Sequence, residues 1–84
     1  MELNIYNNSQ GVNPIFVKAN TELLNSHRLR FDNLPDIESR KNALKELWVT
    51  EYGATLIDSE DGLHWICARF LNQKCATMFF LKWT

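Results

Sequence analysis

The last third of the chain, residues 54–84, carries apolar side chains in a pattern that predicts a β-sheet with two apolar faces. Residues 54–58, 63–70 and 75–83 are rich in strand-forming side chains, and turn-forming residues separate them. Small antiparallel sheets commonly bury one face and leave the other in water. If both faces are apolar, the second face must also be covered, by another part of the chain or by a partner. The pattern therefore indicates a binding surface.

Two turns, at Asp61-Gly62 and at Asn72-Gln73, set the pairing of the three expected strands. With plausible turn lengths the strands have definite faces, although a slip of one residue exchanges the faces of a whole strand. The first face carries Thr55, Ile57, His64, Ile66, Ala68, Phe70, Cys75, Thr77, Phe79, Leu81 and Trp83. The second carries Leu56, Asp58, Leu63, Trp65, Cys67, Arg69, Ala76, Met78, Phe80 and Lys82.

A long helix is expected over residues 34–52, where it can cover the first face. Asn33 can cap it, Pro35 stands in its first turn, and Gly53 follows as a stop because glycine enters the left-handed conformation without steric cost. Its apolar side chains recur at helical spacing and form one stripe, which consists of Ile37, Leu44, Leu47 and Trp48.

The N-terminal third supplies further strands. Residues 3–6 form a first strand that ends at a turn over residues 7–11, and residues 15–19 form a second. The ambiguous segment after it divides into a helical turn at 21–26 and a strand at 27–31 with Leu29 and Phe31 facing inward. We therefore expect one α+β domain, residues 1–84, with one long helix packed on an antiparallel sheet of four to five strands that ends in a C-terminal three-stranded meander.

Charge and composition narrow the function classes. Nine Lys and Arg against ten Asp and Glu give a net charge of −1, which provides no general attraction for nucleic acid or anionic membrane. No apolar run approaches the ~20 residues of a membrane span, and the N-terminus lacks signal-peptide features. The two cysteines, Cys67 and Cys75, are expected to be free thiols. A cytoplasmic location is the expectation.

The sequence contains no motif for catalysis, metal binding or phosphate binding. On a strand, His64 and Cys67 would point to opposite faces, so they cannot share a metal. We expect a protein that is not an enzyme and carries neither a metal nor a small-molecule cofactor.

The second face of the expected sheet is the candidate binding surface. An aromatic centre with a charged rim is typical of interfaces, unless the N-terminal third folds over it as a second core layer. Three carboxylates near the first turn would steer a basic partner. The candidate residues are Trp65, Phe80, Met78 and Leu56 at the centre, Arg69 and Lys82 beside them, and Asp58, Glu60 and Asp61 at the turn.

These features favour a small regulator or inhibitor that binds another protein, of the kind encoded by phages and mobile elements. Two alternatives use the same face. In the first, Trp65 and Phe80 stack on single-stranded nucleic acid while Arg69 and Lys82 contact phosphates. In the second, the face is buried against its own copy in a structural homodimer.

Overall fold

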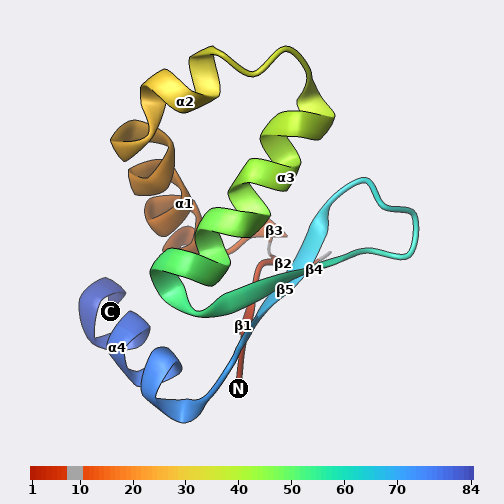
Figure 1. Ribbon diagram of the computed structural model, residues 1–84. Helices are drawn as coiled ribbons and strands as arrows, with labels where there is room; N and C mark the ends of the chain where they lie inside the picture. Colours follow the sequence, from red (N-terminus) through yellow and green to blue (C-terminus); the bar gives the residue numbers. More distant parts are fainter. Residues whose placement is uncertain (8–10) are drawn as a thin grey trace.

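The computed structural model describes residues 1–7 and 11–84, which form a three-stranded antiparallel sheet, a two-stranded ribbon and four α-helices (Figure 1). The chain is α+β, but the predicted sheet of four to five strands under a single long helix is wrong. The sheet has the order β1-β5-β4. The strands of this sheet are β1 (Glu2–Asn4), β4 (Ala54–Asp58) and β5 (Trp65–Phe70). The ribbon consists of β2 (Tyr6–Asn7) and β3 (Gly11–Val12). The helices are α1 (Pro14–Ser26), α2 (Arg28–Asp32), α3 (Ile37–Leu47), the π-helical turn η1 (Trp48–Tyr52) and α4 (Gln73–Trp83).

The third strand of the predicted meander, residues 75–83, is the helix α4. Asn72, which we placed in a turn, caps this helix, because its side-chain oxygen accepts a hydrogen bond from the Cys75 amide at 2.9 Å. Helical spacing then buries Ala76 and Phe79 and leaves Leu81 exposed. Only the first two predicted strands of the meander exist, as β4 and β5.

The strand predicted at residues 15–19 belongs to α1. The Asn13 side chain accepts a hydrogen bond from the Ile15 amide at 2.9 Å, and Pro14 occupies the first turn, where its missing N–H is not needed. Phe16, Ala19 and Leu23 are buried along one face of the helix. Packing of this face outweighs the strand propensity of the β-branched residues around it.

The remaining N-terminal predictions have mixed outcomes. The strand expected at residues 27–31 is the helix α2, in which Phe31 is buried as predicted but Leu29 is 81% exposed. The first strand expected at residues 3–6 is divided between β1 and β2. The turn predicted over residues 7–11 falls mainly on residues 8–10, which lie outside the described residues.

The long helix begins later than predicted and ends where predicted. Asp36, rather than Asn33, caps α3, since its carboxylate accepts a hydrogen bond from the Ser39 amide at 2.7 Å. This bond lowers the pKa of Asp36. The helix continues into the π-helical turn η1 and stops at Gly53, whose φ of 65° is left-handed.

The hairpin of β4 and β5 is paired one residue away from the predicted register. Ala54 lies opposite Phe70 and Leu56 opposite Ala68, with an irregularity between Ile57 and Asp58. We had placed Leu56 and Ala68 on different faces, which is wrong because the irregularity adds a residue to β5 that the predicted turn did not include. The buried sheet face carries Leu3, Ala54, Leu56, Ala68 and Phe70.

The opposite face of the sheet has the usual polar character. It carries Thr55 and Arg69, which are exposed, and Glu2, whose carboxylate accepts a hydrogen bond from the Arg69 side chain at 2.8 Å. Cys67 is the buried member of this face. The expectation of two apolar sheet faces is therefore wrong, and the sheet needs no second cover.

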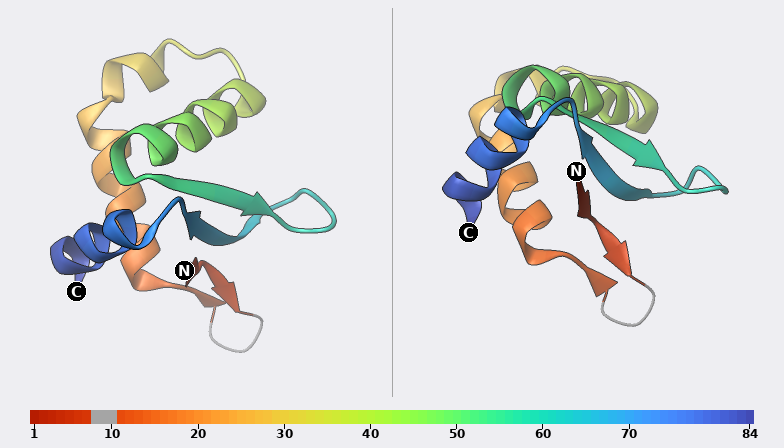
Figure 2. Two further views of the ribbon diagram at one scale, coloured as in Figure 1. Left: turned by 60° about the horizontal axis from the view of Figure 1, so that its bottom comes forward. Right: turned by 90° about the horizontal axis from the view of Figure 1, so that it is seen from below.

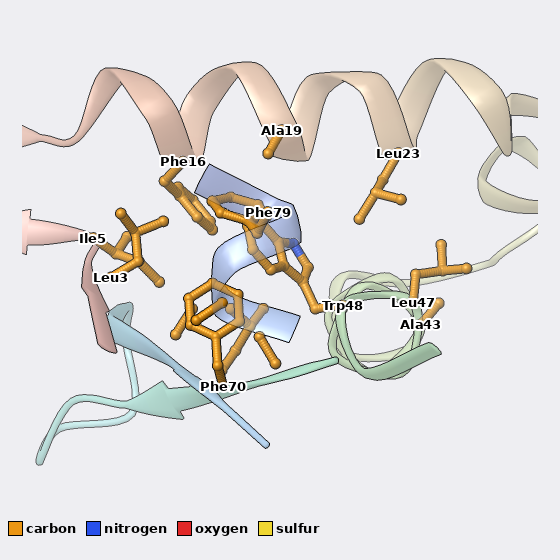
Figure 3. Close-up of a cluster of buried hydrophobic side chains, with 14 of the residues drawn as sticks. Leu3, Ile5, Phe16, Ala19, Leu23, Ala43, Leu47, Trp48, Phe70 and Phe79 are labelled. Atoms are coloured by element: carbon orange, nitrogen blue, oxygen red, sulfur yellow. The ribbon is translucent and has the colours of Figure 1, made fainter. Parts of the chain in front are cut away.

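Trp48 lies at the centre of the core, where the helices meet the sheet (Figure 3). Its ring stacks on Phe16 with centroids 5.2 Å apart and meets the Tyr52 ring edge-on at 4.8 Å. The Tyr52 hydroxyl donates a hydrogen bond to the Ala19 carbonyl at 2.9 Å. Burial, with smaller effects from Glu22 and Glu51, raises the pKa of Tyr52 to about 12.

Candidate interaction groove

A groove with a volume of about 380 Å³ opens between α3, the tip of the β4–β5 hairpin and the β2–β3 ribbon. We call it the α3 groove. The hairpin tip extends past the body of the sheet on the side where α3 begins (Figure 2). Side chains of α3 form one wall of the groove, and side chains of the hairpin form another. The groove is lined mainly by apolar side chains.

Ion pairs hold the hairpin tip against α3. The Asp58 carboxylate contacts Lys45 Nζ at 2.8 Å and Lys41 Nζ at 3.3 Å, and Lys41 Nζ also donates a hydrogen bond to the Gly62 carbonyl at 3.1 Å. The hydrogen bond from Lys45, together with the contribution of Lys41, lowers the pKa of Asp58. These contacts join the hairpin to α3 beside the groove.

The floor of the groove is the outer layer of the core. It includes Ile5, Phe16, Leu44 and Trp65, and the Phe16 and Trp65 rings meet edge-on with centroids 6.2 Å apart. Phe16 in turn stacks on Trp48. A partner in the groove would therefore rest on side chains that the core already holds in place.

The edges of the groove carry apolar side chains that extend into solvent. Ile37 on α3 and Leu63 in the hairpin are each 83% exposed, and Tyr6 and Val12 of the ribbon are exposed to a smaller extent. Single exposed apolar residues are normal on a protein surface, whereas a contiguous group marks an interaction site. Here four of them surround one groove.

The basic side chains that line the groove are Arg40, Lys41 and His64. Lys41 is paired with Asp58, and the His64 ring packs against Tyr6 with centroids 4.8 Å apart. Arg40 is exposed and forms no ion pair within the described part of the chain. The edge of the groove thus carries an unpaired positive charge.

The Trp65 indole contributes an unsatisfied polar atom. Its Nε1 is buried and has no hydrogen-bond partner among residues 1–7 and 11–84. A buried donor without an acceptor costs about 1–3 kcal/mol, so such groups are rare in folded proteins. This cost falls on a residue that lines the groove.

The structure separates the residues that we predicted to share one binding face. Trp65 lines the α3 groove, Leu56 is in the core, and Arg69 is on the opposite sheet face. Met78, Phe80 and Lys82 are on α4, which is not part of the sheet. The proposed stacking of Trp65 and Phe80 on one sheet face is therefore not available.

The three predicted acidic residues stay near the hairpin tip, but two of them are engaged within the fold. Asp58 pairs with the α3 lysines. The Asp61 carboxylate accepts hydrogen bonds from the Ser59 hydroxyl and from the Leu63 amide, which lower its pKa. Glu60 is exposed in the tip.

Sequence reasoning missed most of the groove. Ile37 was assigned to the buried stripe of the helix, because its spacing matches Leu44 and Leu47. It is instead the first residue of α3 and is 83% exposed. Helical spacing shows which residues share a face, but it does not show where along the helix that face stops being covered. The one available signal was Leu63, a bulky apolar side chain directly after the turn glycine Gly62.

A second hollow, of about 500 Å³, lies between α1, η1 and α4. Although it is larger, its polar side chains contact one another: His27 is 3.5 Å from Glu51, and Lys82 is 3.4 Å from Glu22. Leu71 and Met78 are exposed at its edge, and Trp83 Nε1 is buried there without a partner among the described residues, so what distinguishes the α3 groove is its more apolar lining.

In comparisons with protein-family models, curated proteins and solved structures, nothing matches this chain. Within the described ranges, no three His, Cys, Asp or Glu side chains are grouped so that they could hold a metal ion. Nor does any helix in those ranges have the length and apolar character needed to cross a membrane.

Proposed function

We propose that this protein acts without catalysis, by binding a segment of another protein in the α3 groove, as a regulator or inhibitor does. The observation that carries the proposal is the pair Ile37 and Leu63, which are 83% exposed on two different walls of one apolar groove. Burying two such side chains is worth roughly 3–6 kcal/mol before the entropic costs of association.

The exposed edges favour a polypeptide over a small molecule. A small ligand is normally enclosed by its pocket, with a few convergent polar groups that fix its orientation. A molecule confined to the 380 Å³ of the groove would leave most of Ile37 and Leu63 in water. A polypeptide that crosses the groove would cover both.

We also propose a cytoplasmic setting for this interaction. Cys67 and Cys75 are both free thiols, one on β5 and one on α4. Free thiols are stable in a reducing compartment, which supports this placement.

The test is a selection of random short peptides on the immobilised protein, with a parallel selection on an Ile37→Asp, Leu63→Asp variant. Asp at the first residue of α3 lies at the positive end of the helix dipole, so the substitution of Ile37 favours the helix. We expect peptides that bind the wild-type protein and lose binding to the variant. Thermal unfolding of both proteins checks that the variant keeps its fold.

Leu29→Asp is the matched control, because Leu29 is 81% exposed but lies on α2, away from the groove. The selected peptides should bind this control as they bind the wild type. Failure to obtain any peptide that depends on Ile37 and Leu63 would contradict the proposed function.

A further inference from the structure

We infer that the occupant of the α3 groove is an acidic segment of a partner protein, in which a bulky apolar side chain lies next to a carboxylate. The apolar side chain would lie over Phe16 and Trp65, and the carboxylate would pair with Arg40. The inference rests on the proposed function and adds the chemistry of the partner to it.

The charges around the groove carry this inference. No carboxylate is among the described residues that line it, whereas Arg40, Lys41 and His64 are. The whole chain has a net charge of −1, so this grouping departs from the average charge of the protein. Complementary charge at an interface selects among partners and speeds their association.

Three neighbouring carboxylates each have a partner within the fold. Asp36 accepts a hydrogen bond from the Ser39 amide as the cap of α3, and Asp61 accepts one from the Leu63 amide. Asp58 is held by Lys41 and Lys45. The charge of Arg40 contributes to the lowered pKa of Asp36, but Arg40 forms no ion pair within residues 1–7 and 11–84, so its planar guanidinium can still bind an outside carboxylate through two parallel hydrogen bonds.

The lining and the size of the groove indicate that the bound segment carries a bulky apolar side chain. Its floor presents aromatic and aliphatic side chains, including Phe16, Leu44 and Trp65, and its volume of about 380 Å³ has room for a large side chain. Interfaces gain most of their affinity where one bulky anchor fills such a hollow. Acidic residues alone would leave the hollow unfilled.

The experiment repeats the peptide selection with an Arg40→Glu variant. Arg40 is exposed, so reversing its charge should leave the fold intact. We expect wild-type selections to be enriched in Asp or Glu beside Leu, Ile, Phe or Trp. These peptides should bind Arg40→Glu about twofold to fivefold more weakly, as expected for the loss of one exposed ion pair, and the variant should itself select basic peptides.

Arg28→Glu is the control, since Arg28 is an exposed arginine on α2 that does not line the groove. Peptides that depend on Ile37 and Leu63 but show no acidic enrichment, or that bind Arg40→Glu unchanged, would overturn this inference and leave the proposed function standing. An absence of any groove-dependent peptide would overturn both.

Sedimentation equilibrium of the wild type and of Ile37→Asp measures the mass of each protein in solution. It tests whether a second copy of the chain occupies the groove. A wild-type monomer agrees with the inference. A wild-type dimer that becomes monomeric in Ile37→Asp would show that the groove is filled by another copy, and this result would overturn it.

Discussion

The Trp48 indole Nε1 donates a hydrogen bond to Asn20 Oδ1 at 3.0 Å. Trp48 begins the π-helical turn η1 and is fully buried, whereas Asn20 is in the middle of α1. The bond therefore joins two elements that are 28 residues apart in the chain and satisfies the only polar atom of the central core side chain.

Replacing Asn20 with Ala should lower the free energy of unfolding by about 1–3 kcal/mol, because the Trp48 donor would be left buried without a partner. Urea unfolding followed by circular dichroism measures this change. Asn25→Ala is the control, since Asn25 is an exposed asparagine of the same helix. Equal stability of the two variants would show that the bond contributes nothing.

Gly53→Ala should destabilise the fold more than Gly62→Ala does. Both glycines have positive φ, and a side chain in the left-handed region costs about 1–2 kcal/mol. At Gly53 a Cβ would also lie 2.5 Å from Cys75 Sγ, whereas at Gly62 nothing lies within 4 Å. Urea midpoints of the two variants give the comparison, and equal midpoints would mean that α4 moves away without cost.

The pairing of Asp58 with the α3 lysines should make stability depend on acid pH. Its pKa is below the ordinary value of 3.8 in the folded protein, so the unfolded state binds the proton first as the pH falls. The ion pairs thus stabilise the fold above about pH 4 and are lost as the pH drops through the folded pKa. Asp58→Asn should be less stable than wild type at neutral pH, and the difference should shrink below pH 4.

Thermal unfolding over a series of pH values measures this difference between wild type and Asp58→Asn. Asp32→Asn serves as the control, because Asp32 is exposed and forms no ion pair within residues 1–7 and 11–84. A difference for Asp58→Asn that stays constant from neutral to acid pH would argue against the pairing.

Phe79→Ala and Leu81→Ala should differ sharply, because α4 is a helix. A strand would place both side chains on one face, as we first expected, but the helix buries Phe79 and exposes Leu81. Phe79→Ala should cost about 3–5 kcal/mol, and Leu81→Ala no more than about 0.5 kcal/mol. Equal losses by urea unfolding would support the strand.

The sequence-based predictions succeeded where local signals agreed. The strand over Ala54–Asp58 and the end of the long helix at Gly53 are confirmed, because strand-forming residues follow a glycine that can stop a helix. They failed at α1 and α4, although Asn13 and Asn72 are ordinary helix caps. There β-branched and aromatic side chains suggested strands, and burial against distant elements favoured helices.

The groove was beyond prediction for a different reason. Trp65, which we predicted at the centre of a binding face, lines the groove, but its neighbours Tyr6, Val12 and Ile37 come from segments far from it in sequence. Their proximity depends on the ribbon, on the start of α3, and on the register of the hairpin. The expected binding surface does not exist, because residues 75–83 belong to α4 and because a shift of one residue in that register puts Arg69 on the face opposite to Leu56.

The pairing of β1 with β5 has a consequence for how the chain folds during its synthesis. Leu3 lies opposite Ala68, so Leu3 leaves the ribosome well before the strand with which it pairs, and most of the domain is made in between. Until then Leu3 and Ile5, which are both buried in the folded domain, stay exposed to solvent and to chaperones. Contacts between such distant parts of the chain form late, and we expect this domain to acquire its structure in one step near the end of translation of residues 1–84 rather than progressively.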